Sequence, residues 1–236
     1  MGSERLPGKV LKPLSEIPSL VHIFNILRDV KSLDSFLVVT SVLKEDDEIE
    51  KICNSSNVLC VRGSVHDVLD RFRIASASVK PSVIVRVTGD DPLMDPDVIE
   101  KVISEHRAGG FDYTSNIEER TFPRGMDTEV VNADTLEKCW RESGDKDDHE
   151  HVTLYIRRHP DKFKMKNVEM SGAPADDLRL CLDTEEDYIL LQNIYSRLYR
   201  GKPIRLPEIF ELLEKEPSLK KINESIEQKK VKDKVY

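Results

Sequence analysis

The sequence predicts an α/β fold in which a parallel sheet is covered on both faces by helices. Its 236 residues suit one domain, or one domain with a small extension. Over the first hundred residues, short apolar runs alternate with amphipathic segments, and the connections between them are short. That alternation is typical of a parallel sheet between helices. Because ligands of such sheets bind beyond the carboxyl ends of the strands, the residues that directly follow strands are the candidates for function.

The first half of the chain supplies the regular part of this pattern. Leu20, Phe24 and Leu27 recur at helical spacing, and Pro96 suits the first position of a helix. The run SVIVRVT at 82–88 is rich in β-branched residues and is the clearest strand. In chain order we expect a helix over 18–32, a strand over 35–40, a helix over 45–56, a strand over 58–61, a helix over 67–77, a strand over 82–88 and a helix over 96–106.

The second half is less regular. In chain order we expect strands over 111–115 and 127–131, helices over 133–142 and 149–158, extended segments over 163–168 and 178–182, and helices over 185–199 and 207–215. The tail from Lys220 is rich in lysine and glutamate, so we expect it to be frayed or disordered.

Composition excludes several classes of protein. The formal net charge is −8, whereas proteins that bind nucleic acid generally present a basic face, so we expect no nucleic-acid partner. A local cluster of cations can still bind a phosphorylated substrate on an acidic protein. No apolar run approaches the roughly 20 residues of a membrane helix, and the start lacks the pattern of a signal peptide. We therefore expect no membrane partner and a cytoplasmic location.

The opening segment MGSERLPGKVL has the composition of an anion-binding loop. Gly2 and Gly8 let the backbone fold closely around a ligand, and Arg5 and Lys9 supply positive charge. Backbone N–H groups of such a loop can also face an anion. The segment does not match the Walker pattern, because Val10 follows Lys9. The alternative is a flexible, solvated amino terminus.

Two carboxylates come directly after strands. Asp90 follows the strand at 82–88, and Asp183 ends the extended segment at 178–182. Together they could hold Mg²⁺, which is usually bound by one or two carboxylates and by substrate phosphates. Nearby acids have simpler explanations: Asp95 suits the N-cap of the following helix, and Asp91 suits a turn. Asp183 could likewise begin a helix.

A further polar group lies in the irregular half of the chain. The segment RTFPRGMDTEV contains Arg120, Arg124, Asp127 and Glu129 around a proline and a glycine. It could form a binding loop or a charged surface hairpin, and the residues alone favour neither.

With these segments in view, the chain resembles the cytidylyltransferases of the spore-coat polysaccharide biosynthesis type, relatives of acylneuraminate and 3-deoxy-manno-octulosonate cytidylyltransferases. The resemblance extends over nearly everything up to about residue 199. It rests on six ordered segments: MGSERLPGKVL (1–11), RGSVHDVLDRF (62–72), VRVTGDDPLMDP (85–96), SNIEERTFPRGMDTEVV (115–131), EHVTLYIRRHP (150–160) and LRLCLDTEEDY (178–188).

This resemblance implies a fold and an activity. The fold would be the nucleotide-diphospho-sugar transferase type, with a Rossmann-like, mixed, mostly parallel sheet and a small α+β lid. Residues 1–200 would form the nucleotidyltransferase domain, and 201–236 a C-terminal helix with a charged tail. The enzyme would transfer a cytidylyl group from CTP to a sugar, with a nonulosonic acid as one candidate, and release pyrophosphate for surface polysaccharide or glycan synthesis. Mg²⁺ would be the cofactor, and a homodimer is one expectation because relatives often form dimers.

The resemblance also implies roles for individual residues, at the positions that match the motifs of the family. The catalytic residues would be Arg5, Lys9 and Asp90. The metal would be held by Asp90 and Asp183. The nucleotide would be bound by Gly2, Ser3, Arg5, Lys9, Arg62, Gly63, Ser64, Asp67 and Arg71. The acceptor sugar would be bound by Phe122, Pro123, Gly125, Asp127 and Glu129. No residue can be named as the base that activates the sugar hydroxyl.

The sequence departs from the family at its start. In the family a hydrophobic strand and a Gln-Ala-Arg segment precede the Met-Gly-Ser, whereas here Met1 opens the sequence. The first strand is therefore expected to be missing, either because the true start lies upstream or because the element has been lost, and the chain as written is expected to be less stable or less active than an extended one. Two alternatives stay open: a nucleotidyltransferase that uses another nucleoside triphosphate or a sugar 1-phosphate, and a non-catalytic nucleotide-binding protein.

Overall fold

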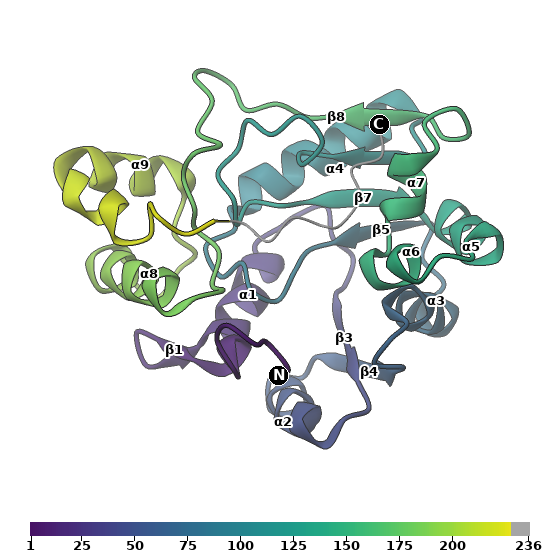
Figure 1. Cartoon of the computed structure of the whole chain (residues 1–236), viewed down its shortest axis with the longest axis horizontal. Coiled ribbons are helices and arrows are strands. Elements are labelled where there is room, and N and C mark those ends of the chain that lie inside the picture. Colours follow the sequence, from purple (N-terminus) through teal and green to yellow (C-terminus); the bar gives the residue numbers. More distant parts are fainter. Residues whose placement is uncertain (228–236) are drawn as a thin grey trace.

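Strands and helices alternate in the computed structural model, which describes residues 1–227 (Figure 1). The strands are β1 Pro13–Leu14, β2 Ile17–Pro18, β3 Leu37–Ser41, β4 Leu59–Gly63, β5 Val83–Arg86, β6 Tyr113–Ser115, β7 Glu129–Asn132 and β8 Met165–Asn167. The helices are α1 Ser19–Arg28, α2 Asp47–Ser55, α3 Val68–Val79, α4 Pro96–Gly109, α5 Ala133–Glu142, α6 Lys146–His151, α7 Leu154–Arg158, α8 Glu185–Leu198 and α9 Leu206–Lys215. Short 3₁₀ helices are η1 Lys9–Leu11, η2 Lys44–Asp46 and η3 Pro217–Ile222.

The strands form two main sheets and one small hairpin. β3 pairs in parallel with β4, and a separate sheet has the order β5-β7-β6-β8. Within that sheet β7 runs antiparallel to both β5 and β6, while β6 and β8 are parallel. The expected α/β fold with a mixed sheet is confirmed, and β7 accounts for its antiparallel pairings. The hairpin of β1 and β2 was not expected from the sequence.

Helices cover both faces of the larger sheet, as the sequence predicts. On one face, Ile23 of α1 and Ile103 of α4 pack in one apolar cluster with Val85 of β5. On the other face, Leu69 of α3 packs in a second cluster with Val131 of β7, together with residues of α5 and α7. Among the described residues, no helix is both long enough and apolar enough to cross a membrane.

Three expected elements differ in the structure. The helix expected over 149–158 is two helices, α6 and α7, because the backbone of Val152 has a positive φ of 59° between them. The segment 178–182 joins no sheet and makes one isolated parallel bridge, between Arg124 and Arg179. The prediction of a frayed tail from Lys220 is wrong at its start, since η3 extends to Ile222 and Asn223 after it is buried. Its remainder at 228–236 lies outside the described residues.

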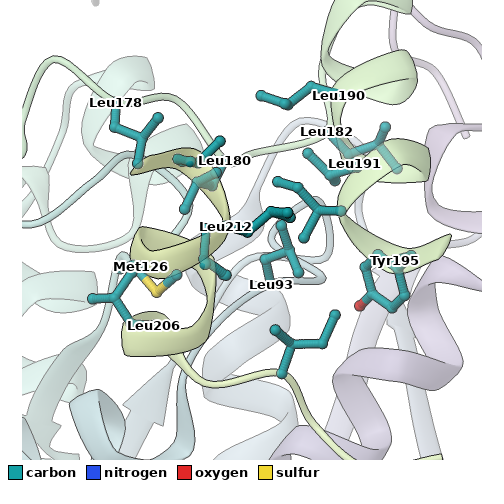
Figure 2. Close-up of a cluster of buried hydrophobic side chains, with 14 of the residues drawn as sticks. Leu93, Met126, Leu178, Leu180, Leu182, Leu190, Leu191, Tyr195, Leu206 and Leu212 are labelled. Atoms are coloured by element: carbon teal, nitrogen blue, oxygen red, sulfur yellow. The ribbon is translucent and has the colours of Figure 1, made fainter. Parts of the chain in front are cut away.

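A third apolar cluster joins the segment 178–182 to the C-terminal helices. Leu180 and Leu182 are fully buried and pack with residues of α8, α9 and η3 (Figure 2). Figure 1 shows α8 and α9 together at one end of the molecule, opposite α5, α6 and α7. Residues beyond 200 therefore share their core with the preceding segment. The expected division at residue 200 stays a prediction.

Candidate active site

The amino-terminal loop is folded onto the protein. Gly8 has a left-handed backbone with φ 68°, which a glycine adopts without strain, and its N–H donates to the carbonyl of Met1. Leu6 is buried in the third apolar cluster and anchors the middle of the loop. The amino group of Met1 donates to Asp46 Oδ1 at 2.9 Å. The loop is therefore held against the protein by contacts at its start, middle and end.

Lys9 lies between the two carboxylates that follow strands in the sequence pattern. Its Nζ donates to Asp90 Oδ2 at 2.5 Å and to Asp183 Oδ1 at 3.0 Å. The side chains of all three residues are largely shielded from solvent. Asp90 follows β5, and Asp183 directly precedes α8, whose N-cap is Thr184. The structure thus brings together two aspartates that are 93 positions apart in the printed sequence.

Backbone hydrogen bonds of the segment 178–182 place Asp183 beside Asp90. The N–H of Leu182 donates to the carbonyl of Asp90 at 2.7 Å, and the N–H of Leu180 donates to the carbonyl of Arg124 at 2.8 Å. Gly125 makes this approach tight: its φ is 98°, and a Cβ there would lie 2.7 Å from the carbonyl carbon of Leu180. The segment therefore fits between the loop after β5 and the loop at 124–125.

Two arginines complete the cluster around Asp183. The guanidinium of Arg5 donates to Asp183 Oδ2, and Nη2 of Arg179 lies 3.4 Å from the same oxygen. Arg179 is held by Asp187, to which it donates from Nε and Nη2 at 2.9 Å each. Asn223 fixes Asp187 further by donating to its Oδ1 at 2.8 Å. This part of the site is therefore built by a buried ion pair between Arg179 of the segment 178–182 and Asp187 of α8, and by Asn223, which follows η3.

Sequence reasoning missed Arg179 and Asp187. One signal was available: alternate residues of an extended segment share a face, so Arg179 and Asp183 lie on the same side while Leu180 and Leu182 lie on the other. The role of Asp187 had no local signal, because its partner Asn223 is distant in the sequence.

Asp91 does not face the cluster in the way Asp90 does. It is buried, and it accepts a hydrogen bond from Thr88 Oγ1 at 2.5 Å. Burial, with the neighbouring charges of Asp90 and Asp127, raises the pKa of Asp91 well above its usual value. Burial, with the charge of Asp91, likewise raises the pKa of the Cys181 thiol. This side of the cluster therefore favours neutral or positively charged groups.

The donor set of Asp90 and Asp183 fits a hard divalent cation. Both carboxylates reach the same nitrogen of Lys9, so one cation can contact both. Among the described residues, no group of three His, Cys, Asp or Glu side chains converges in the way a fully protein-ligated metal requires. Mg²⁺ suits two carboxylates, because it keeps several waters and takes its other ligands from substrate phosphates.

The residues expected to contact the nucleotide are dispersed around the end of β4. Arg62 is engaged with α2, since its Nη1 lies 2.8 Å from Asp47 and 2.9 Å from Glu50. Ser64 accepts a hydrogen bond from the N–H of His66. Gly63 lies against Arg71, because a Cβ on Gly63 would lie 2.8 Å from Arg71 Cγ. Gly2 and Ser3 lie in the amino-terminal loop, where Ser3 Oγ accepts from the N–H of Leu6.

Arg71 and Asp67 differ in the hydrogen-bond partners of their side chains. Within the described residues, Arg71 Nε is buried and has no hydrogen-bond partner. Burial lowers the pKa of Arg71. Asp67 is the N-cap of α3: it accepts from the N–H of Asp70 at 2.7 Å, and its other oxygen bonds His149 Nδ1 at 2.8 Å. Arg71 is thus available to a ligand, whereas Asp67 positions α3.

Of the residues expected to bind the acceptor, Asp127 is partly exposed, whereas Phe122, Pro123, Gly125 and Glu129 are buried. Phe122 is 3% exposed, and Glu129 is 2% exposed. Burial alone would raise the pKa of Glu129, but the charge of Arg86 and hydrogen bonds from Thr153 and Tyr113 outweigh it and lower the pKa. Neither side chain offers much surface to a ligand.

The partly exposed residues of this block are Arg124 and Asp127, and Arg124 forms a bridge with Arg179 of the segment 178–182. Asp127 forms a bidentate pair with Arg120, at 2.6 and 2.8 Å. Pro123 lies just before the tight turn at Gly125. Within the described residues, the half-buried side chain of Arg124 has no ion-pair partner, and burial together with the charge of Arg120 lowers its pKa. Arg124 therefore presents a positive charge that the fold does not neutralise.

Comparison with known proteins identifies the family of this chain. The family model described as Cytidylyltransferase matches residues 1–234. The spore coat polysaccharide biosynthesis protein SpsF of Bacillus subtilis (strain 168) is 38% identical over 226 residues, which cover 92% of each chain.

Solved structures share the fold. A cytidylyltransferase from Leptospira borgpetersenii serovar Hardjo-bovis superposes with a TM-score of 0.89 at 30% identity, over 97% of this chain and 95% of that one. CMP:2-keto-3-deoxy-manno-octonic acid synthetase complexed with CTP has a TM-score of 0.63 at 13% identity, over 83% of this chain and 95% of that one, which is a likeness of fold alone. The fold is therefore that of the nucleotide-sugar transferases. This chain belongs to the cytidylyltransferase family, and it is a nucleotidyltransferase enzyme.

Proposed function

We propose that the protein transfers a cytidylyl group from CTP to a sugar and releases pyrophosphate. The observation that carries this proposal is the meeting of Arg5, Lys9, Asp90 and Asp183 at the carboxyl end of β5. Two cations and two carboxylates at one strand end suit a triphosphate accompanied by a divalent metal. Family membership supports the cytidine base.

The chemistry requires charge neutralisation more than covalent participation by the protein. Phosphoryl transfer depends on positioning and on stabilising the negative charge that develops on phosphate oxygens. Lys9 and Arg5 can bind those oxygens, as a point charge and as a bidentate fork respectively. Asp90 and Asp183 would hold Mg²⁺, which when bound supplies further positive charge at the same place. Without nucleotide, the same carboxylates neutralise Lys9 and Arg5.

The remaining expected residues take roles that follow from their surroundings. We propose that Arg71, with its unsatisfied Nε, contacts the nucleotide beside Gly63. In the loops at residues 2–3 and 62–64, backbone groups rather than side chains are the proposed contacts, because Arg62 is engaged with α2 and Ser64 is engaged locally.

For the acceptor, Arg124 and Asp127 are the proposed contact residues, with Pro123 and Gly125 shaping the loop. Phe122 and Glu129 support that loop from beneath, since both are buried. The positive charge of Arg124 supports an acceptor with a carboxylate, such as a nonulosonic acid. We further propose that the reaction takes place in the cytoplasm and serves surface polysaccharide synthesis, since the relative SpsF is a spore coat polysaccharide biosynthesis protein.

The test is pyrophosphate release measured with each of the four nucleoside triphosphates, with and without Mg²⁺. Acceptors would be 2-keto-3-deoxy sugar acids, neutral sugars and sugar 1-phosphates. Release with CTP alone, in the presence of a sugar acid and Mg²⁺, is the expected result. Release with another nucleotide or a sugar 1-phosphate would replace the proposed substrates. Nucleotide binding without any release would identify a non-catalytic protein.

The first prediction concerns Asp90. Asp90→Asn removes a carboxylate from the site but keeps the volume of the side chain, so we expect turnover with CTP to fall by about 100-fold or more while the fold is retained. Steady-state pyrophosphate release measures turnover, and the melting temperature checks the fold. The matched control is Asp161→Asn at an exposed turn, which should leave turnover unchanged. Full activity of Asp90→Asn would remove this residue from the mechanism.

A further inference from the structure

Asp187 of α8 contacts the backbone of Asp183, the candidate metal ligand. Its side chain is fully buried, and its Oδ2 accepts hydrogen bonds from the N–H of Asp183 at 3.1 Å and from the N–H of Thr184 at 3.0 Å. Arg179 donates to both oxygens of Asp187 and supplies the positive charge that a buried carboxylate needs. Asp187 therefore holds the backbone from which the Asp183 carboxylate projects.

Asn223, which follows η3, links this ion pair to the C-terminal part of the chain. Its side chain is buried, and its Nδ2 donates to Asp187 Oδ1 at 2.8 Å and to the backbone carbonyl of Arg179 at 3.0 Å. Because a buried oxygen that loses its donor costs free energy, these two hydrogen bonds favour one arrangement of the pair. One amide group thus holds both members of the ion pair.

The segment that contains Asn223 meets the site at a second point. The carbonyl of Glu227 accepts from Nη1 of Arg5 at 3.3 Å, and the same guanidinium donates to Asp183. Leu219 of η3 is buried in the third apolar cluster, which also contains residues of α8. The position of Asn223 is therefore fixed by the packing of its segment as well as by its own hydrogen bonds.

Asp183 is thus held from two directions along the chain. The hydrogen bond from Leu182 to the carbonyl of Asp90 fixes the segment that precedes it. The hydrogen bonds to Asp187 fix the turn that leads from it into α8. Groups that orient a metal ligand typically change metal affinity or activity by about 10- to 100-fold when they are removed. The contacts of Asn223 therefore bear on the metal as well as on the fold.

From these contacts we propose that Asn223 is a positioning residue of the active site. Acting through Asp187, it directs the Asp183 carboxylate and so sets how strongly a divalent cation assists nucleotide binding. The part that concerns the metal rests on the proposed function, whereas the link from Asn223 to the backbone of Asp183 does not. The C-terminal segment thereby contributes to the site, although it lies beyond residue 200.

The test removes the amide group of Asn223. Asn223→Leu keeps a branched side chain but loses both donated hydrogen bonds. It is preferred to a substitution of Asp187, which would take away the carboxylate that neutralises the buried Arg179 and endanger the fold.

The matched control is Asn132→Leu. Asn132 is half-buried, and its Nδ2 donates to the carbonyl of Phe111 at 2.9 Å, so the control also loses a hydrogen bond between distant parts of the chain. Asn132 lies opposite Val83 at the start of β5, whereas Asp90 follows the end of that strand. The control therefore reports a loss of stability away from the site.

The first readout is the binding of CTP, titrated by calorimetry in EDTA and in excess Mg²⁺. In EDTA, Asn223→Leu should bind CTP within about twofold of the unsubstituted chain, because Arg5 and Lys9 are retained. The gain in affinity on adding Mg²⁺ should fall by about tenfold or more. Asn132→Leu should keep the full gain. A merely structural role for Asn223 would not separate the two conditions.

The second readout is hydrogen exchange of the N–H groups of Asp183 and Thr184 in the free protein, measured by NMR. Both should exchange about tenfold faster or more in Asn223→Leu, because the carboxylate that accepts from them is no longer fixed. In Asn132→Leu their rates should stay unchanged. This readout requires neither nucleotide nor metal, so a wrong assignment of CTP leaves it intact.

Three results would overturn the proposal. Unchanged exchange at Asp183 and Thr184 would show that Asn223 does not hold this backbone. Faster exchange with an undiminished gain from Mg²⁺ would show that the contact does not act on the metal. Equal effects of the two asparagine variants would reduce the role of Asn223 to general stability. Absence of any gain from Mg²⁺ in the unsubstituted chain would instead refute the proposed function, and exchange would still decide whether Asn223 positions Asp183.

Discussion

Asp46 joins the amino terminus to the end of β3. It accepts from the amino group of Met1 through Oδ1, and from Thr40 and from the N–H and hydroxyl of Ser41 through Oδ2. Burial alone would raise the pKa of Asp46, but the hydrogen bonds from Ser41, Met1 and Thr40 outweigh it and lower the pKa from 3.8 to about 2.

This pKa predicts how stability depends on pH. A carboxylate whose pKa is lower in the folded state stabilises the fold above its unfolded pKa, and that contribution is lost as pH falls toward the folded value. We expect the folded chain to be more stable than Asp46→Asn at pH 6, and the difference to shrink as pH falls from about 4 to about 2. Urea unfolding midpoints across this range measure it.

The control for this prediction is Glu45→Gln, at the exposed neighbouring position. That variant should follow the unsubstituted chain at every pH. A stability difference between Asp46→Asn and the unsubstituted chain that stays constant down to pH 2 would contradict the predicted origin of the effect.

Individual residues of the site were predictable to different degrees. Asp90, Asp183, Arg5 and Lys9 could be named because they follow strands or lie in a loop rich in glycine and charge. The structure brings them together, while their roles stay predictions. Glu129 could not be recognised as a buried ion-pair partner, because Arg86 meets it through strand pairing that no local pattern specifies.

Among the elements, α3 ends in a strained conformation. Its C-cap is Lys80, with φ 50° and ψ 54°, in the left-handed region that glycine adopts without cost. Lys80→Gly should stabilise the fold by about 1 kcal/mol, because a side chain in this conformation is unfavourable by that order. The melting temperature should rise by about 2–4 °C.

A matched lysine elsewhere gives the opposite sign. Lys51 lies within α2 and is exposed, so Lys51→Gly should destabilise the fold by about 1 kcal/mol through the poor helix propensity of glycine. If both variants changed stability in the same direction, the backbone conformation of Lys80 would not be the cause.

The helices were more predictable than the pairing of the strands. Helical spacing is local, so α1, α4, α5 and α8 appear close to their expected ranges. The antiparallel direction of β7 depends on partners distant in sequence. The break at Val152 accompanies a hydrogen bond from Thr153 to the buried Glu129, and η3 is followed by Asn223, which reaches α8. Contacts between residues distant in the sequence therefore determine each element that the sequence pattern did not predict.

At the scale of the whole molecule, the charge of the protein and the charge of its site have opposite consequences. The chain has 44 acidic and 36 basic residues, giving a formal net charge of −8, so its long-range field repels a nucleoside triphosphate. The attraction that binds the triphosphate must then come from Arg5 and Lys9 at short distance, where the amino-terminal loop positions them.

This contrast predicts the effect of salt on nucleotide binding. On the proposed function, Arg5→Gln should weaken binding of CTP with Mg²⁺ by about tenfold at low salt, and the loss should shrink at high salt, because screening weakens the exposed part of the interaction. Isothermal titration at several salt concentrations measures both. The control, Lys202→Gln at an exposed position, should change neither. A loss independent of salt would assign Arg5 a structural role.

The fold class could be predicted because local sequence patterns indicate the alternating strands and helices of the first hundred residues. The pairing of the strands into two sheets could not be predicted, since it depends on partners that are distant in the sequence. The third apolar cluster was equally hidden, because it gathers residues from 6 to 219.

Gly125 has a consequence that reaches beyond its own turn. The absence of a side chain at Gly125 lets the carbonyl group of Leu180 lie close to it, and Asp183 follows Leu180 three positions later in the same segment. A methyl group at position 125, as in Gly125→Ala, would clash with the segment 178–182 and move the carboxylate of Asp183 away from Lys9. The distance between Asp90 and Asp183 thus depends on residue 125, which contacts neither of them. A substitution at this position could change the activity of the enzyme without altering any charged residue.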